Sequence, residues 1–104
     1  MASSKEYLAF VLDQLSPLRD ISYRSMMGEY LICYRGKLVG GIYDDRFLVK
    51  PTPSAKRLMP NAPLELPYEG AKEMILVDEI DDREFLIKLI GAMAAELPEP
   101  KKKQ

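Results

Sequence analysis

The stretch from residue 21 to residue 50 constrains the fold more than any other part of the chain, because β-type runs follow one another there with very short connections. Runs rich in branched and aromatic residues occupy positions 21–27, 29–35, 37–43 and 46–50. Arg35 with Gly36, and Asp44 with Asp45, are residue types that suit tight hairpin turns. We therefore predict a meander of antiparallel strands over this stretch.

Helical patterns are found near both ends of the chain. Ser3 and Glu6 have the spacing of a capping box, and the apolar residues that follow recur at helical spacing, which predicts a helix over residues 4–15. Near the other end, Asp81 is expected to cap a final helix with a wide apolar stripe that stops before Pro98. Both helices are amphipathic, so we expect them to pack on the sheet.

The segment between the meander and the final helix is less regular. Ser54 is expected to cap a short helix that ends before Pro60. Residues 60–70 contain three prolines and are expected to be mostly irregular. Residues 73–78 have an apolar centre bounded by charged residues, which predicts a buried strand.

Together these elements predict one α+β domain over residues 1–98, in which helices pack on one face of an antiparallel β-meander sheet to give two layers. A chain of 104 residues is long enough for one hydrophobic core and short for two. Residues 99–104 are basic and have nothing apolar to bury, so we expect a disordered tail there.

Composition argues against several classes of function. The net charge of −1 means that the chain lacks the broad positive field behind most non-specific nucleic-acid affinity. Because there is no histidine and Cys33 is the single cysteine, neither a histidine-based nucleophilic site nor a cysteine-based zinc site can be built within one chain. We expect no enzyme activity, no cofactor and no metal. No signal peptide or membrane-spanning run is recognisable, which favours a cytoplasmic protein.

The remaining candidates for chemistry have structural explanations. Asp44 and Asp45 lie where a hairpin needs residues that tolerate left-handed dihedral angles. Gly40 and Gly41 lie inside a strand pattern without the spacing of a phosphate loop, which indicates a bulge or a close approach to the sheet. Cys33 is flanked by sheet residues and is expected to be a packed, unreactive thiol.

Cations and aromatic residues on neighbouring strands leave a second interpretation open. Arg24, Arg35, Lys37 and Arg46 lie among tyrosines, which is the composition of sheet surfaces that stack bases. Acidic residues are interleaved with them, so direct nucleic-acid binding is the less favoured interpretation. A nucleic-acid-binding module that uses this strand face remains the alternative function.

Several residues of the meander carry a family resemblance. They are Met26, Met27, Gly28, Gly36, Gly41, Asp44, Asp45 and Lys50. With their neighbours they resemble the N-terminal domain family of the competence regulator TfoX, also called Sxy, and the similarity extends over nearly the whole chain. Met27 stands where this family usually has an aromatic residue, and Glu29 replaces its second glycine.

The resemblance implies an α+β domain with helices on one face of an antiparallel sheet, often a homodimer, with no known catalytic residue or cofactor. In full-length regulators of this kind a helical C-terminal domain follows, and the protein works with the cyclic AMP receptor protein at competence-gene promoters. We therefore expect a small non-enzymatic regulatory domain that acts through protein contacts, with a transcription factor as the expected kind of partner.

The expected contact surface is the sheet face that the helices leave open. Large apolar residues lie on both faces of the strand at residues 29–35, and a helix layer covers only one face. Tyr30, Ile32, Tyr34 and Ile42 are the predicted anchors of the open face, and a second copy of the chain is its predicted partner.

Overall fold

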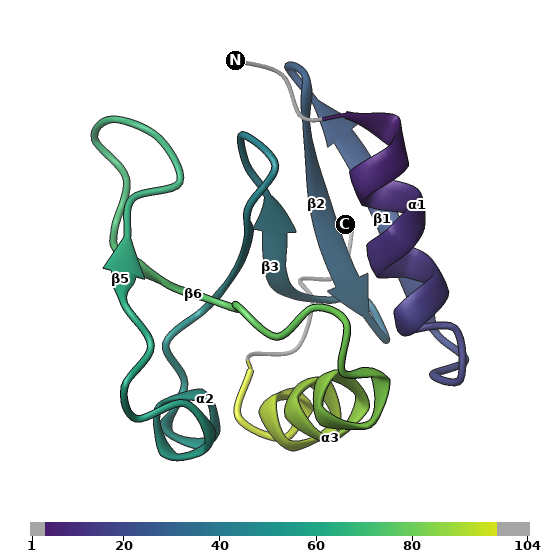
Figure 1. Ribbon diagram of the computed structural model, residues 1–104, viewed down its shortest axis with the longest axis vertical. Helices are drawn as coiled ribbons and strands as arrows, with labels where there is room; N and C mark the ends of the chain where they lie inside the picture. Colours follow the sequence, from purple (N-terminus) through teal and green to yellow (C-terminus); the bar gives the residue numbers. More distant parts are fainter. Residues whose placement is uncertain (1–3, 98–104) are drawn as a thin grey trace, which may run out of the picture.

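A computed structural model of the chain describes residues 4–97 (Figure 1). The helices in this range are α1 (Lys5–Gln14), α2 (Pro53–Leu58) and α3 (Arg83–Ala94). The strands are β1 (Ile21–Met26), β2 (Glu29–Tyr34), β3 (Lys37–Ile42), β4 (Phe47–Val49), β5 (Leu64–Glu65) and β6 (Met74–Leu76). All of these strands belong to one antiparallel sheet, which confirms the α+β class expected from the sequence.

Tight hairpin turns join the first four strands. Positive φ angles occur at both central residues of each turn: 54° at Met27 and 87° at Gly28, 54° at Arg35 and 79° at Gly36, and 54° at Asp44 and 56° at Asp45. Two successive positive φ angles are the mark of a type I′ turn, whose twist matches that of the flanking strands. Because each reversal takes only two residues, β1 to β4 lie side by side in sequence order.

The sheet has the strand order β1-β2-β3-β4-β6-β5, so β1 and β5 are its edges. The pairing of β2 with β3 shifts by one residue: Ile32 lies opposite Gly40, whereas Cys33 lies opposite Leu38. Val39 is therefore the extra residue of a β-bulge beside Gly40. The bulge that the glycine pair indicates is confirmed.

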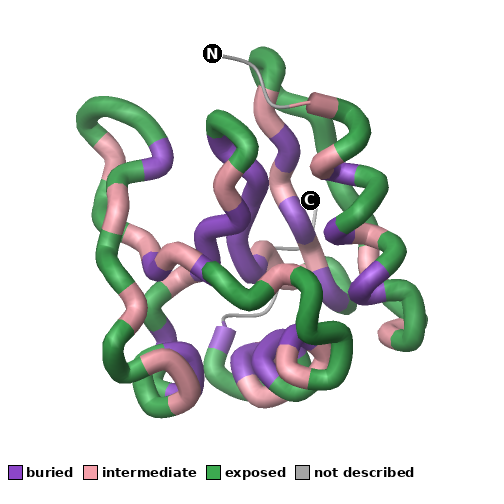
Figure 2. Tube along the Cα trace, viewed as in Figure 1, coloured by how far each residue is buried: buried purple, intermediate pink, exposed green. Residues whose placement is uncertain are grey.

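The hydrophobic core lies on one face of the sheet, between the strands and the inner sides of α1 and α3 (Figure 2). Helix side chains that belong to it include Leu8, Val11, Leu15, Leu86, Leu89, Ile90 and Met93. The strands contribute alternate residues, as their pleat requires. Each fully buried aliphatic side chain contributes about 1.5–3 kcal/mol of apolar transfer free energy, so the core is the main source of stability.

A side chain caps the start of each helix, and all three caps differ from the sequence-based expectation. For α2 the cap is Thr52 rather than Ser54, and its hydroxyl accepts a hydrogen bond from the Ala55 amide at 3.2 Å. Pro53 explains the shift, because proline has no N–H and a φ suited to the first helical position, so the helix begins earlier.

The other two caps lie one residue beyond those expected. The Ser4 hydroxyl accepts from the Tyr7 amide at 3.1 Å, in place of Ser3, which lies outside the described residues. The Asp82 carboxylate accepts from the Phe85 amide at 3.1 Å, in place of Asp81. Neighbouring residues of the same type are equivalent candidates for a cap, so the sequence alone does not choose between them.

The segment expected to be irregular after α2 contains β5, which pairs with β6 at the far edge of the sheet. The proposed boundary at residue 98 and the tail of residues 99–104 lie outside the described residues. Over residues 4–97 no helix has the length and apolar character needed to cross a membrane.

Candidate functional site

The four predicted anchors of an open contact surface lie in the hydrophobic core. The exposed fraction is 9% for Tyr30 and Tyr34 and zero for Ile32 and Ile42. The structure corrects their expected placement, because strand alternation puts all four on the face that the helices cover. The homodimer expected from the sequence loses its proposed contact surface and stays a prediction.

The opposite face of the sheet is covered in part by the loop that follows β5. Leu48 is fully buried there although it lies outside the main core. The Tyr43 ring lies over Gly41, and a β-carbon added at Gly41 would be 2.8 Å from its atoms. The centre of the Tyr68 ring lies 6.2 Å from the centre of the Tyr43 ring. Burial raises the pKa of the Tyr43 hydroxyl, with smaller effects of Tyr68 and Glu29 in the same direction. The loop therefore covers the part of this face that carries Tyr43 and Leu48.

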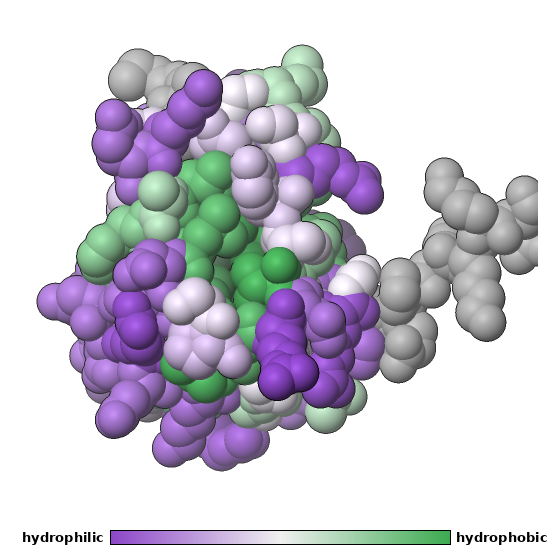
Figure 3. All heavy atoms as spheres, turned by 90° about the vertical axis from the view of Figure 1, so that its right-hand side faces the viewer, coloured by the Kyte–Doolittle hydropathy of each residue, from purple (hydrophilic) through white to green (hydrophobic). Residues whose placement is uncertain are grey.

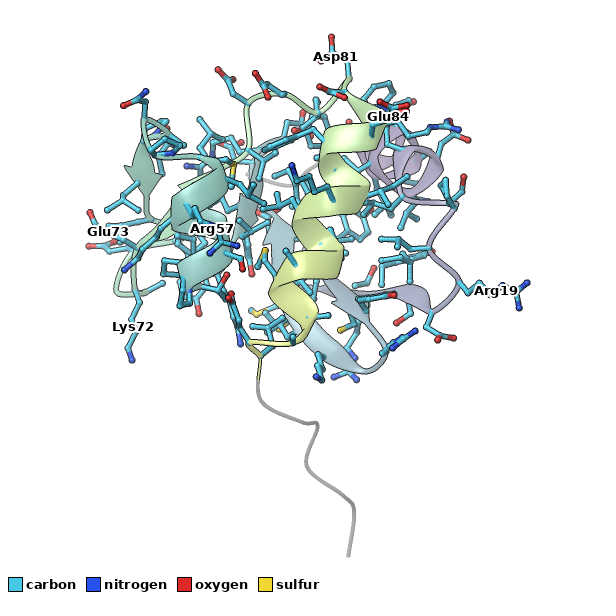
Figure 4. All side chains as sticks on the ribbon, turned by 90° about the horizontal axis from the view of Figure 1, so that it is seen from below. Arg19, Arg57, Lys72, Glu73, Asp81 and Glu84 are labelled. Atoms are coloured by element: carbon cyan, nitrogen blue, oxygen red, sulfur yellow. The ribbon has the colours of Figure 1, made fainter. Side chains whose placement is uncertain are left out.

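A hollow of about 420 Å³ remains between this loop and β3. Tyr43, Tyr68 and Lys50 are among the residues that line it. Lys72 and Glu73 stand at its rim, and their side chains point away from the sheet into solvent (Figure 4). These two charged side chains therefore do not converge on the hollow, as groups that orient a small ligand do.

Arg46, one of the four cations of the alternative nucleic-acid surface, is held by its own chain. Its guanidinium lies 2.6 Å from the Glu65 carboxylate. It also donates to the carbonyls of Tyr43 at 3.1 Å and Leu66 at 3.3 Å. A guanidinium with these partners joins the β3–β4 turn to β5, and a phosphate would have to compete with all of them.

Two more of these cations are also engaged. Arg35 lies 3.8 Å from Asp20 and 5.3 Å from the centre of the Tyr34 ring. Lys37 donates to the Ala94 carbonyl at the end of α3, at 2.8 Å. Register places Arg24 on the other face of the sheet from Lys37, because Arg24 pairs with Leu31 whereas Lys37 pairs with the core residue Tyr34. The four cations do not form one continuous basic stripe.

The paired aspartates have the structural roles expected of them. Asp44 and Asp45 form the turn between β3 and β4, and the Asp45 carboxylate accepts from the Ser4 amide at 2.8 Å. The Glu29 carboxylate accepts from the Asp44 amide at 3.2 Å. Within residues 4–97 there is no group of three or more histidine, cysteine, aspartate or glutamate side chains that is placed to hold a metal ion.

The most exposed regular element of the sheet is its edge strand β1. Every residue from Ser22 to Met26 is exposed, whereas the neighbouring strand β2 alternates between buried and half-buried residues. Tyr23 keeps 51% of its surface exposed, and its ring meets the Tyr30 ring edge to face at 6.0 Å. A large, half-exposed aromatic side chain on an edge strand is available to a partner.

A groove runs between α1 and β1. Its apolar lining comprises Leu8, Leu12, Leu18, Ile21, Tyr23 and Tyr30, and we call it the α1–β1 groove. Two hollows of about 490 and 460 Å³ make it up, and both contain Leu12 and Tyr23. Figure 3, which faces the side that carries α1, shows apolar residues in a band between hydrophilic areas. The charged residues that line it, Lys5 and Arg19, are both cations.

Comparison with known proteins places this chain in a family. The model of the TfoX N-terminal domain matches residues 13–91. The chain belongs to the TfoX N-terminal domain family. It is also 35% identical over 102 residues to an uncharacterized 12.7 kDa protein in the trpE 5′ region of Spirochaeta aurantia, which covers 97% of this chain and 89% of that protein. No solved structure matches the chain.

In this TfoX N-terminal domain the matched range includes β1 and most of the lining of the α1–β1 groove. Sequence reasoning missed the exposure of β1 at the edge of the sheet. A usable signal was present, since Ser22, Arg24 and Ser25 make it more polar than a strand covered on both sides. The partial alternation of the segment is that of an edge strand.

Proposed function

We propose that this chain is a non-enzymatic interaction domain that binds a protein partner in the cytoplasm through β1 and the α1–β1 groove, as part of transcription regulation. One observation carries the proposal: a six-residue edge strand is exposed from Ser22 to Met26 directly beside an apolar groove. Membership of the TfoX N-terminal domain family supports the regulatory role.

Edge strands normally carry features that prevent pairing with another chain. Proline, a bulge, several charges or a very short strand each serve this purpose. The other edge, β5, is two residues long and is protected by its length. β1 has six residues, no proline, unbroken pairing with β2 and a single charge at Arg24. An unprotected edge next to apolar surface is expected to have a partner.

A crosslinking experiment tests this function. A photoreactive residue replaces Ser25, on the exposed edge, in one variant and Lys88, on the exposed side of α3, in another. We expect crosslinks to another protein in host cells from position 25, and their loss when Tyr23→Pro is added. Equal crosslinking at both positions, or none at position 25, would exclude β1 as the contact surface.

A further inference from the structure

We infer that the partner segment is an extended peptide in which acidic and apolar residues alternate, and that it adds to β1 as a further strand of the sheet. This inference rests on the proposed function and names the class of its partner. It draws on the backbone groups of β1, the two faces beside them and the charges around the α1–β1 groove.

The backbone of β1 presents hydrogen-bonding groups at its outer edge. Bonded pairs alternate along an antiparallel ladder. The Asp20 carbonyl accepts from the Arg35 amide at 3.0 Å, which places the inward-facing groups of β1 at the even-numbered residues. The amides and carbonyls of Tyr23 and Ser25 therefore face outward. An added strand gains affinity from such groups and specificity from its alternate side chains.

The two sides of β1 require different side chains of an added strand. Tyr23 lies on the groove side, opposite the core residue Ile32, and Arg24 lies on the other side, opposite Leu31. Residues of the added strand beside Tyr23 face the apolar α1–β1 groove and are expected to be apolar. Residues beside Arg24 face an exposed guanidinium and are expected to be acidic, because opposite charges on neighbouring strands attract.

The charges near the groove favour the same class of segment. Lys5 and Arg19 lie in its lining, and Figure 4 shows Arg19 projecting into solvent from the loop before β1. Nearby carboxylates have other partners: Asp13 lies 3.0 Å from Arg83, and Asp20 pairs with Arg35. Lys5 and Arg19 at the groove and Arg24 on the strand are the cations that an acidic segment would meet there.

A second copy of the chain fits this surface less well. Antiparallel pairing of β1 with its own copy would bring the end of one groove that carries Arg19 toward the end of the other that carries Lys5. Like charges placed together in a contact oppose association. An acidic strand would instead be attracted by Arg19 at one end of the groove and by Lys5 at the other.

Fluorescence anisotropy with short labelled peptides tests the inference. The probe alternates glutamate and valine; one control replaces glutamate with lysine, and another has the probe's composition with its glutamates and valines in separate blocks. We expect binding of the alternating acidic probe, binding at least about tenfold weaker for the block peptide, none for the lysine peptide, and weaker binding at high salt. Equal binding of the block or lysine peptide would overturn the inference.

Variants of the chain locate the binding surface. Tyr23→Pro removes an outward amide without removing a bond to β2, so we expect it to abolish probe binding while the fold persists. Arg24→Glu should weaken binding about tenfold, and Lys88→Glu, the same charge change on exposed α3, should leave it unchanged. Circular dichroism verifies that each variant folds. If Tyr23→Pro does not fold, the binding of the probe by Arg24→Glu tests the inference. Unchanged binding of Arg24→Glu would overturn the inference.

The two proposals fail in distinguishable ways. Crosslinks from position 25 together with no binding of the alternating acidic probe would overturn the peptide class and leave β1 as the contact surface. Light scattering that gives twice the chain mass of 11.8 kDa, and a single mass after Tyr23→Pro, would identify a second copy as the occupant and also overturn the peptide class. Absence of crosslinks together with absence of probe binding would overturn both the contact surface at β1 and the class of its partner.

Discussion

Glu96, just beyond α3, accepts two hydrogen bonds from Ser54 in the first turn of α2, at 2.9 Å from the amide and 2.6 Å from the hydroxyl. A helix of six residues such as α2 is not stable by itself in water, so contacts of this kind hold it against α3. The hydrogen bonds from Ser54 lower the pKa of the Glu96 carboxyl from its ordinary value near 4.5.

The lowered pKa of Glu96 predicts an acid-dependent loss of stability. The stabilisation is fully present above the unfolded-state pKa near 4.5 and is lost as the pH falls through the lower folded-state pKa. Glu96→Gln should lower the melting midpoint at neutral pH, and its difference from wild type should shrink below pH 4.5. Thermal melts over a pH series measure this, with Glu73→Gln, at an exposed carboxylate, as control. A difference that is constant with pH would contradict the prediction.

Gly40 and Gly91 should respond in opposite directions to the same substitution. A β-carbon at Gly40 would collide with the Leu48 carbonyl oxygen and lie 2.8 Å from the Val49 α-carbon, both backbone atoms that cannot move aside easily. Gly40→Ala should destabilise the fold by about 1–3 kcal/mol. At Gly91, in α3, nothing lies within 4 Å of the added carbon. Gly91→Ala should stabilise by about 0.5–1 kcal/mol, as urea titration would show.

Met27 occupies an unfavourable position for its residue type. Its φ is 54°, and 96% of its surface is exposed, so packing does not compensate for the left-handed backbone. Met27→Asn creates the Asn-Gly pair that type I′ turns favour and should raise stability by about 0.5–1 kcal/mol. Met27→Ala removes the side chain without this preference and should give no gain. Equal stability of the two variants in urea would contradict the explanation.

Ile32 should respond as a core residue rather than as an interface residue. Its side chain is fully buried, so Ile32→Asp places a carboxylate in the core without a partner and should cost more than about 3 kcal/mol. Ser22→Asp, on exposed β1, should change stability by less than about 0.5 kcal/mol. Circular dichroism compares the two. A folded Ile32→Asp variant that only changes oligomeric state would return Ile32 to the contact surface.

Local chemistry determined much of the fold. Gly36 and Asp44-Asp45 specify turns because few residue types accept the required dihedral angles, and Pro60 marks where α2 must end. Helix caps were predicted less well, because Ser54 and Thr52, or Asp81 and Asp82, are chemically equivalent candidates. Membership in the family was also accessible from the residues of the meander.

The tertiary structure alone decided which face of the sheet meets the helices. β2 has apolar residues on both of its faces. The alternation of side chains along the strand therefore does not show whether the helices cover the face with Ile32 or the face with Cys33. Docking of α1 and α3 chose the first. The return of the loop after β5 over the opposite face depends on contacts between residues far apart in the chain, such as Tyr43 with Tyr68. Because the helices cover one face and this loop covers part of the other, the most exposed strand is the edge at β1, which no local pattern specifies.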